Sequence, residues 1–168
     1  MLSPALVERL NDQLNFELES AYVYFSMAAY MEGQSLDGFA HWMKLQAEEE
    51  IGHAMRIYKY LTDLGANVTL EAIKKPPCDF SSVLNAFETA LKHEENLARR
   101  LNEIAGVALS EKDNTTYQFL DWFLTEQVEE ISSVGTVCDK LRLIGDNGYG
   151  ILMLNTELGA RQKEPAPQ

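Results

Sequence analysis

The sequence predicts an all-α protein, a four-helix bundle with one long crossover and a short fifth helix near the C-terminus. Apolar residues recur in steps of three and four over four long stretches, each about 27–30 residues, or about 40–45 Å at 1.5 Å per residue. No stretch shows the alternation typical of a strand. Short turns separate the first stretch from the second and the third from the fourth, whereas a long segment separates the second from the third. The predicted bundle therefore consists of two antiparallel hairpins joined by a crossover.

Capping residues mark the first two helices. Ser3 and Pro4 are typical of an N-cap followed by the first helical residue, and Gly33 ends this helix. Ser35 is expected to cap the second helix, and Gly65 follows its end, where a glycine is favoured. The first stripe is Leu10, Leu14, Glu17, Ala21, Tyr24, Ala28 and Met31, and the second is Phe39, Met43, Gln46, Glu50, His53, Ile57, Tyr60 and Leu64.

The crossover and the second hairpin follow. Residues 66–80 have no stripe and contain Pro76 and Pro77, which break helices. Ser81 or Ser82 is expected to cap the third helix, and Gly145 to stop the fourth. The two stripes are Leu84, Phe87, Leu91, Glu94, Ala98, Leu101, Ala105 and Ala108, then Leu120, Phe123, Gln127, Glu130, Val134, Val137, Leu141 and Ile144.

The end of the chain predicts a fifth helix from the shorter stripe Ile151, Leu154 and Leu158. Residues 1–160 are expected to form one domain, which is the simplest reading of 168 residues. Residues 161–168 contain two prolines and are expected to be a frayed tail.

Composition narrows the partners and the compartment. The chain is 46% apolar, enough to fold, and its net charge of −12 argues against nucleic acid and anionic membranes while favouring cations. Cys78 and Cys138 form no CxxC pair and are expected to be free thiols. Neither a signal peptide nor a bilayer-spanning apolar run is evident, so we expect a soluble cytoplasmic protein.

Acidic residues interrupt each long stripe near its middle. The interrupting carboxylates are Glu17, Glu50, Glu94 and Glu130, with His53 three residues after Glu50. Because the middles of equal-length antiparallel helices lie at one level, these groups are expected to converge in one buried layer. Buried carboxylates are costly unless positive charge lies among them, and two divalent cations balance four such charges. Oxygen ligands with one nitrogen and no sulfur favour iron or manganese over structural zinc.

Other residues leave alternatives open. Glu49, Glu126 and Glu129 form either a solvated acidic surface or a third, weaker cation site beside the pair. Tyr24 lies two helical turns from Glu17, so it is either a core residue or a redox-active phenol near the metals. Trp42 and Trp122 lie off the stripes and are expected to cover subunit contacts, whereas His41 and His93 have no acidic partner in register.

These residues and spacings resemble the non-haem bacterial and archaeal ferritins over essentially the whole chain. The resemblance implies that Glu17, Glu50 and His53 hold one iron and that Glu50 also bridges to a second. The implied ligands of the second iron are Glu50, Glu94 and Glu130, and those of a third site are Glu49, Glu126, Glu129 and Glu130. Gln127 and Tyr24 are implied to lie beside the pair.

The resemblance also implies an activity and an assembly. It predicts a ferroxidase that oxidises Fe(II) with O2 or H2O2 and stores ferric mineral in a hollow shell, usually of twenty-four subunits. Haem is not expected, because the fourth helix has no second ExxH motif and Ile51 stands where a bacterioferritin has its haem-binding methionine. Rival interpretations are a rubrerythrin-like peroxidase, which normally carries a CxxC iron domain, a structural bundle with a satisfied polar layer, and a Dps-like shell, whose ligands lie between subunits.

Overall fold

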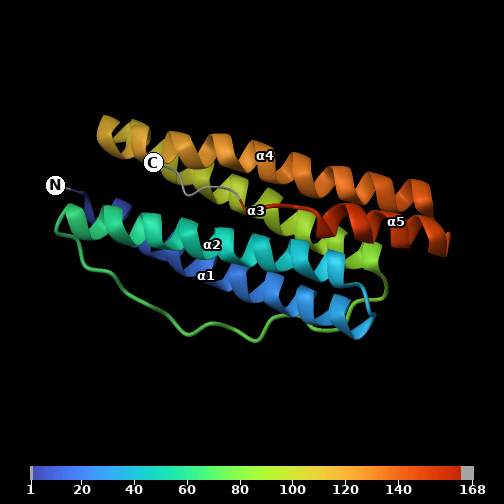
Figure 1. Cartoon of the computed structure of the whole chain (residues 1–168). Coiled ribbons are helices and arrows are strands. Elements are labelled where there is room, and N and C mark those ends of the chain that lie inside the picture. Colours follow the sequence, from blue (N-terminus) through green and yellow to red (C-terminus); the bar gives the residue numbers. More distant parts are fainter. Residues whose placement is uncertain (1, 164–168) are drawn as a thin grey trace.

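The computed structural model describes residues 2–163, which form five helices and no strand. The helices are α1 (Pro4–Gly33), α2 (Asp37–Asp63), α3 (Val83–Ser110), α4 (Asn114–Ile144) and α5 (Gly148–Gly159). Figure 1 shows α1 and α2 as one hairpin, α3 and α4 as a second, and α5 beside the start of α2. The predicted bundle with a long crossover and a short fifth helix is confirmed.

Local capping explains most helix ends. The hydroxyl oxygen of Ser3 accepts a hydrogen bond from the Leu6 amide at 3.1 Å, and that of Ser82 accepts one from the Asn85 amide at 3.0 Å. Each bond satisfies an amide that has no partner within its helix. Gly65, just past α2, has a φ of +71°, a left-handed conformation that glycine adopts without a Cβ penalty.

The start of α2 differs from the prediction. Ser35 does not cap it, because Ser35 has a φ of 59° and belongs to the turn that closes α1. The N-cap is Leu36, which has no side chain that could accept a bond. Instead the Asn155 side-chain oxygen on α5 accepts bonds from the amides of Gly38 (2.9 Å) and Phe39 (3.1 Å). A residue more than a hundred positions away therefore caps α2.

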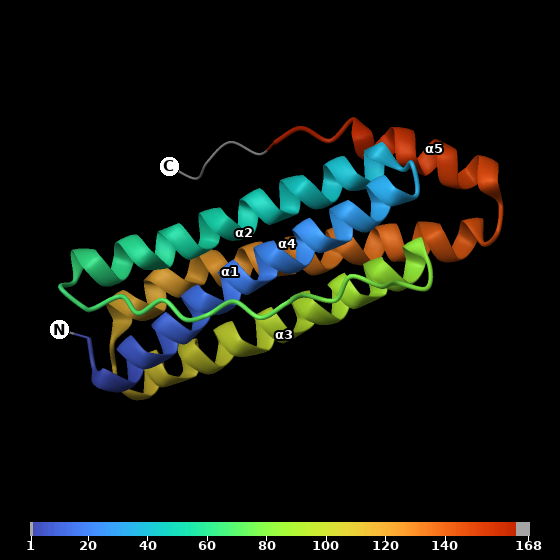
Figure 2. The same ribbon diagram turned by 90° about the horizontal axis from the view of Figure 1, so that it is seen from below.

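Helix α5 packs unusually close to α2 at Gly38. A Cβ atom added to Gly38 would lie 1.8 Å from the Asn155 carbonyl oxygen, so only glycine permits this approach. The segment after α5 then continues beside α2 (Figure 2). Arg161 and Lys163 form ion pairs with Glu49 and Glu48, so these residues are not the frayed tail that the sequence predicted. Residues 164–168 lie outside the described residues.

The crossover, residues 64–82, runs beside α1 (Figure 2). Two asparagines of α1 replace the partners that an extended backbone lacks. The Asn11 side chain donates to the carbonyl of Asn67 at 3.0 Å and accepts from the Thr69 amide at 2.7 Å. Asn15 bonds the Thr69 carbonyl and the Glu71 amide in the same way, each at 2.8 Å. These bonds fix the path that joins the two hairpins.

The apolar core forms two clusters along the bundle. One contains Tyr24, Trp42 and Phe87, and the other contains Leu10 and Phe123. The mid-helix carboxylates lie in sequence between these two sets. Trp42 is only 2% exposed, so the expectation that it covers a subunit contact is wrong. Burying this large, uncharged ring in the core is more favourable than leaving it at the surface.

Two further expectations can be examined in the fold. Cys78 is exposed and Cys138 is buried, and both are free thiols, as predicted. Among the described helices, none combines the length and the apolar character that crossing a membrane requires.

Candidate metal centre

The four helices of the bundle each contribute one buried carboxylate at mid-length. Glu17 comes from α1, Glu50 from α2, Glu94 from α3 and Glu130 from α4, and none of them is more than 6% exposed. His53, one turn after Glu50, is 8% exposed. Each lies on the apolar stripe of its helix, so the packing that buries the stripes also buries these acids.

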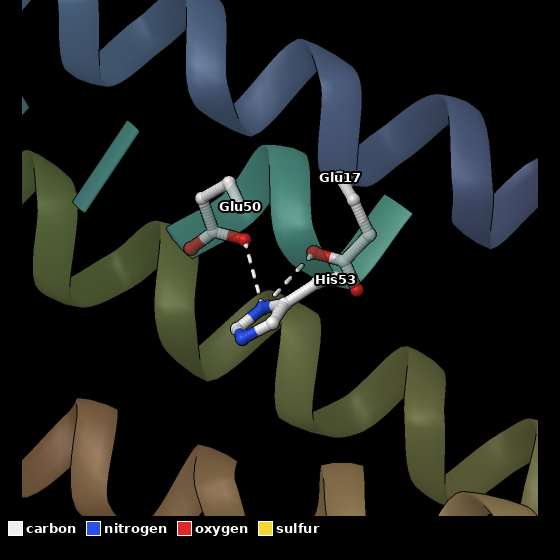
Figure 3. Close-up of side chains that lie close together, drawn as sticks. All are labelled: Glu17, Glu50 and His53. Carbon is white, nitrogen blue, oxygen red and sulfur yellow. Dashed lines mark ion pairs between the residues drawn. The ribbon is translucent and has the colours of Figure 1, made fainter. Parts of the chain in front are cut away.

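Glu17, Glu50 and His53 point toward one another (Figure 3). The Nδ1 atom of His53 lies 3.3 Å from Oε2 of Glu50 and 4.0 Å from Oε2 of Glu17. One potential ligand atom from each residue lies within 4.8 Å of the others, so a single cation could contact all three. Two of these residues, at i and i+3 on α2, share one helical face.

A second group of potential ligands adjoins the first. His53, Glu126 and Glu130 each offer one ligand atom within 4.8 Å of the other two. His53 therefore lies between the carboxylates of α1 and α2 and those of α4. Glu94 has a different partner, because the Tyr24 hydroxyl donates a hydrogen bond to its Oε1 atom.

Glutamine side chains orient three of the four carboxylates. Each donates from its amide nitrogen to one carboxylate oxygen: Gln13 to Glu17 (2.8 Å), Gln46 to Glu130 (2.6 Å) and Gln127 to Glu94 (2.6 Å). An amide is neutral, so it fixes the direction of a carboxylate without supplying the positive charge that the layer lacks. The second oxygen of Glu17 stays directed into the layer.

Three buried oxygens of the layer have no hydrogen-bond partner among residues 2–163. They are Oε2 of Glu17 and both carboxylate oxygens of Glu50. Buried acceptors without a donor are rare in folded proteins because each costs about 1–3 kcal/mol or more. A polar layer with a purely structural role would not explain why these three oxygens are buried at this cost. A bound cation would explain it, because it would satisfy all three oxygens. Both carboxylate oxygens of Glu50 are therefore available to a cation.

Burial and mutual repulsion hold protons on this layer. Desolvation, followed by the charge of Glu50, raises the pKa of Glu17 well above its usual value. Desolvation and then Glu94 raise the pKa of Glu50 in the same way, and they raise that of Glu130 to about 8. Burial likewise raises the pKa of Glu94. Strongly perturbed carboxylates gathered in one place are typical of a functional site.

The second acidic group opens to solvent beside this layer. Glu126, Glu129 and Glu130 line an open cavity of about 550 Å³. Arg161, from the segment after α5, lines the same cavity and donates to Oε2 of Glu49 at 2.8 Å. Three of the four carboxylates expected at a third site thus line a cavity that also holds a positive side chain, and the fourth, Glu49, bonds that side chain.

Three residues of this arrangement were absent from the sequence prediction. Gln13 lies four residues before Glu17, and that spacing was a usable signal. Arg100 donates to the Gln13 side-chain oxygen at 3.1 Å across two helices, and no local pattern indicates this. Arg161 was assigned to a frayed tail, although it continues the spacing of Leu154 and Leu158.

The donor set suits a hard or borderline cation. Carboxylate oxygens dominate, one imidazole nitrogen contributes, and no sulfur lies in the group, which matches iron or manganese. The four carboxylates carry the charge that two divalent cations would neutralise. The unpartnered oxygens of Glu17 and Glu50 therefore fit iron.

Comparisons with known proteins agree with this geometry. Residues 7–144 match the family described as the ferritin-like domain. A bacterial non-heme ferritin of Staphylococcus aureus is 43% identical over 161 residues, which cover 96% of this chain and 97% of the relative.

Solved structures show the same similarity. An open-pore ferritin of Archaeoglobus fulgidus is 43% identical, with a TM-score of 0.95 and coverage of 96% of this chain and 100% of the other. An engineered closed form of the Archaeoglobus fulgidus ferritin matches at a TM-score of 0.96, with 43% identity and coverage of 98% and 100%. With the fold, the carboxylate layer and these matches in agreement, the chain belongs to the ferritin family.

Proposed function

We propose that this protein is an iron-storage ferritin with ferroxidase activity, which takes up Fe(II), oxidises it at the buried layer and stores the ferric product. The observation that carries the proposal is the set of unpartnered oxygens on Glu17 and Glu50. Glu17, Glu50 and His53 would bind the first Fe(II). Glu50, Glu94 and Glu130 would bind the second, with Glu50 between the two.

The chemistry balances in electrons and charge. Two Fe(II) ions supply two electrons, which reduce O2 with two protons to H2O2, or reduce H2O2 with two protons to two water molecules. Four ionised carboxylates match the charge of two Fe(II) ions, so loading requires loss of the protons that burial holds on the layer. Gln13, Gln46 and Gln127 would keep three carboxylates oriented, while Tyr24 would position Glu94 beside the second iron.

The oxidised iron then has a short route out of the layer. Glu130 belongs to the layer and also lines the open cavity together with Glu126 and Glu129. Glu49, on α2, bonds Arg161, which lines the same cavity. We place the third cation site at these four carboxylates, where ferric iron would leave the pair.

Assembly into a shell is part of the same proposal. Large apolar side chains remain exposed on a single chain, including Tyr22, Phe25, Met55 and Tyr58, each between 38% and 52% exposed. Exposed apolar side chains in such number are typical of a subunit interface. We propose a homo-oligomer of twenty-four subunits in the cytoplasm, whose acidic composition suits a cation-filled interior. No haem is included, because α4 has no second ExxH motif and Ile51 stands where a bacterioferritin has its haem-binding methionine.

The direct test compares Glu50→Gln with Glu95→Gln, which changes an exposed carboxylate on α3 next to Glu94. Glu50→Gln is expected to slow Fe(II) oxidation by orders of magnitude, because an amide is a poor ligand and cannot bridge two cations. His53→Ala is expected to act in the same direction. Stopped-flow absorbance of ferric iron after mixing with aerobic buffer measures the rate.

Folding is monitored separately. Metal-free Glu50→Gln is expected to be at least as stable as the wild type, because the substitution removes a buried acid whose two oxygens accept no hydrogen bond from residues 2–163. Particle mass shows whether the variant still assembles. Unchanged Fe(II) oxidation kinetics in a correctly assembled Glu50→Gln protein would contradict the proposal.

A further inference from the structure

The segment that follows α5 is held against α2 by several independent contacts. The His41 ring nitrogen Nε2 donates to the Arg161 carbonyl at 2.9 Å, and the Lys163 ammonium bonds Glu48 at 2.6 Å. The Arg161 guanidinium also lies over the Trp42 ring, 4.9 Å from its centroid. Such a cation–π contact adds to the orientation of the guanidinium. Arg161 is therefore placed by the fold and is not a loose surface side chain.

The guanidinium occupies both carboxylate oxygens of Glu49. Its Nη2 atom donates to Oε2 at 2.8 Å and to Oε1 at 3.2 Å. The two side chains are only 19% and 16% exposed, so water and salt screen this pair less than an ordinary surface pair. Charge-assisted bonds of this kind are among the stronger hydrogen bonds in proteins.

The same arginine reaches a second carboxylate through an amide. Its Nη1 atom donates to Oε1 of Gln46, and the Gln46 amide nitrogen donates to Oε2 of Glu130 at 2.6 Å. Arg161 also lines the cavity that Glu126, Glu129 and Glu130 line. One positive side chain thus contacts Glu49 directly and Glu130 through Gln46.

Arg100 provides an internal comparison. It also acts through a glutamine, because its Nε atom donates to Gln13, which donates to Glu17. Its Nη2 atom donates to the Asp12 carbonyl, and its guanidinium lies over the Phe16 ring. Arg100 therefore orients a ligand from outside, whereas Arg161 directly takes the oxygens that a third cation would need.

We propose that Arg161 is a built-in cation that competes with a metal ion for the third site. A metal ion that uses Glu49 must first displace the guanidinium, and it is repelled by the same positive charge while Arg161 remains. The third site therefore binds a metal ion more weakly than the same four carboxylates would without the guanidinium, which suits a place of transit more than one of retention. This inference rests on the third site of the proposed function and assigns Arg161 as its regulating residue.

Zinc binding to the assembled, metal-free protein tests the proposal without relying on oxidation. Isothermal titration with Zn²⁺, a redox-inert probe, is compared for the wild type, Arg161→Gln, Arg161→Lys and Lys163→Gln. Glu129→Gln identifies the third-site transition, because Glu129 belongs to that site alone. Lys163→Gln is the matched control, since it removes a positive charge from the same segment but leaves Glu49 bonded to Arg161.

Arg161→Gln is expected to raise the third-site affinity for Zn²⁺ by about tenfold or more, the effect of losing one charge-assisted interaction. Lys163→Gln is expected to bind like the wild type. Arg161→Lys keeps the charge but loses the planar donor pair, so an intermediate affinity is expected, and this variant also covers the case in which Arg161→Gln fails to fold.

An unchanged or weaker third site in Arg161→Gln would overturn the inference, because it would mean that the arginine is neutral or helps to organise Glu49 for metal. Absence of a third transition in every variant would overturn it as well. If the wild type does not bind two Zn²⁺ ions per chain tightly, that result would instead contradict the proposed function. The failures of the two ideas are therefore distinguishable.

Discussion

At the scale of single residues, Glu50 and Glu130 differ in what holds them. Glu130 receives a bond from Gln46, whereas both oxygens of Glu50 are buried without a donor. The first arrangement fixes a direction, and the second leaves a carboxylate available to two neighbours. This difference in hydrogen bonding supports the proposed roles of Glu130 as an oriented ligand and of Glu50 as the bridging ligand.

The raised pKa of Glu130 predicts a pH dependence of stability in the metal-free protein. Its pKa of about 8 exceeds the ordinary value of 4.5, so the folded state binds its proton more tightly than the unfolded state does. The resulting stabilisation is complete below pH 4.5 and is lost as the pH rises to about 8. Thermal unfolding at several pH values should show this decline.

Metal and substitution provide the controls for that measurement. Saturating Zn²⁺ should remove much of the decline, because the bound cations stabilise the ionised carboxylates. Glu130→Gln should make the decline shallower, since the amide does not titrate. A metal-free wild type whose stability rises steadily between pH 5 and 8 would contradict the assigned protonation.

The four buried mid-helix acids could be predicted from the sequence because each interrupts an otherwise apolar stripe. Gln46 and Gln127 were visible in the same stripes, but their partners were not. Each lies close in sequence to a ligand of its own helix, yet bonds a carboxylate of another helix. Helical periodicity determines which residues face the core, whereas hydrogen bonds across helices depend on the relative rotation of the helices.

At the scale of elements, α5 acts as the cap of α2. Asn155 supplies the acceptor that Leu36 lacks, and Gly38 permits the close approach. Sequence patterns within α2 could not reveal this, and Ser35 offered a plausible but wrong local alternative. The same docking brings Arg161 to Glu49, so the end of the chain and the acidic group are linked through α5.

Gly38→Ala is expected to lower the free energy of unfolding by about 1–3 kcal/mol, because its Cβ would meet the Asn155 carbonyl oxygen at 1.8 Å and force α5 away. Gly106→Ala is the control. It lies within α3 with nothing within 4 Å of the added Cβ, and it should gain about 0.5–1 kcal/mol. Chemical denaturation measures both.

Gly38→Ala and Gly106→Ala should therefore change stability in opposite directions. Equal effects of the two substitutions would show that α5 does not need the close contact at Gly38. The affinity of the third site should also change in Gly38→Ala, because displacement of α5 moves the segment that carries Arg161.

At the scale of the whole molecule, iron storage requires a hollow shell of subunits as well as a reactive centre. The bundle separates two apolar clusters by one acidic layer, and this arrangement was predictable from the mid-stripe acids and the equal lengths of the four helices. The shell was not predictable in this way, because exposed apolar residues indicate an interface without giving its symmetry. The proposed number of twenty-four subunits therefore rests on the resemblance to the family alone.

Storage predicts that the assembled particle takes up hundreds or more iron atoms from aerobic Fe(II). Particle mass by native mass spectrometry, combined with iron analysis after gel filtration, measures the capacity. A dimer that holds two irons per chain would instead indicate an enzyme without storage, and would contradict the proposed hollow shell.

The central claim is that two irons react together in one buried site, and Mössbauer spectroscopy tests it most directly. The assembled metal-free protein is loaded without oxygen with two Fe(II) per chain, enriched in the Mössbauer isotope, and frozen shortly after exposure to air. We predict the signal of a spin-coupled ferric pair in the wild type and its loss in Glu50→Gln. Isolated ferric ions in the wild type, with no coupled pair at any early time, would contradict the claim.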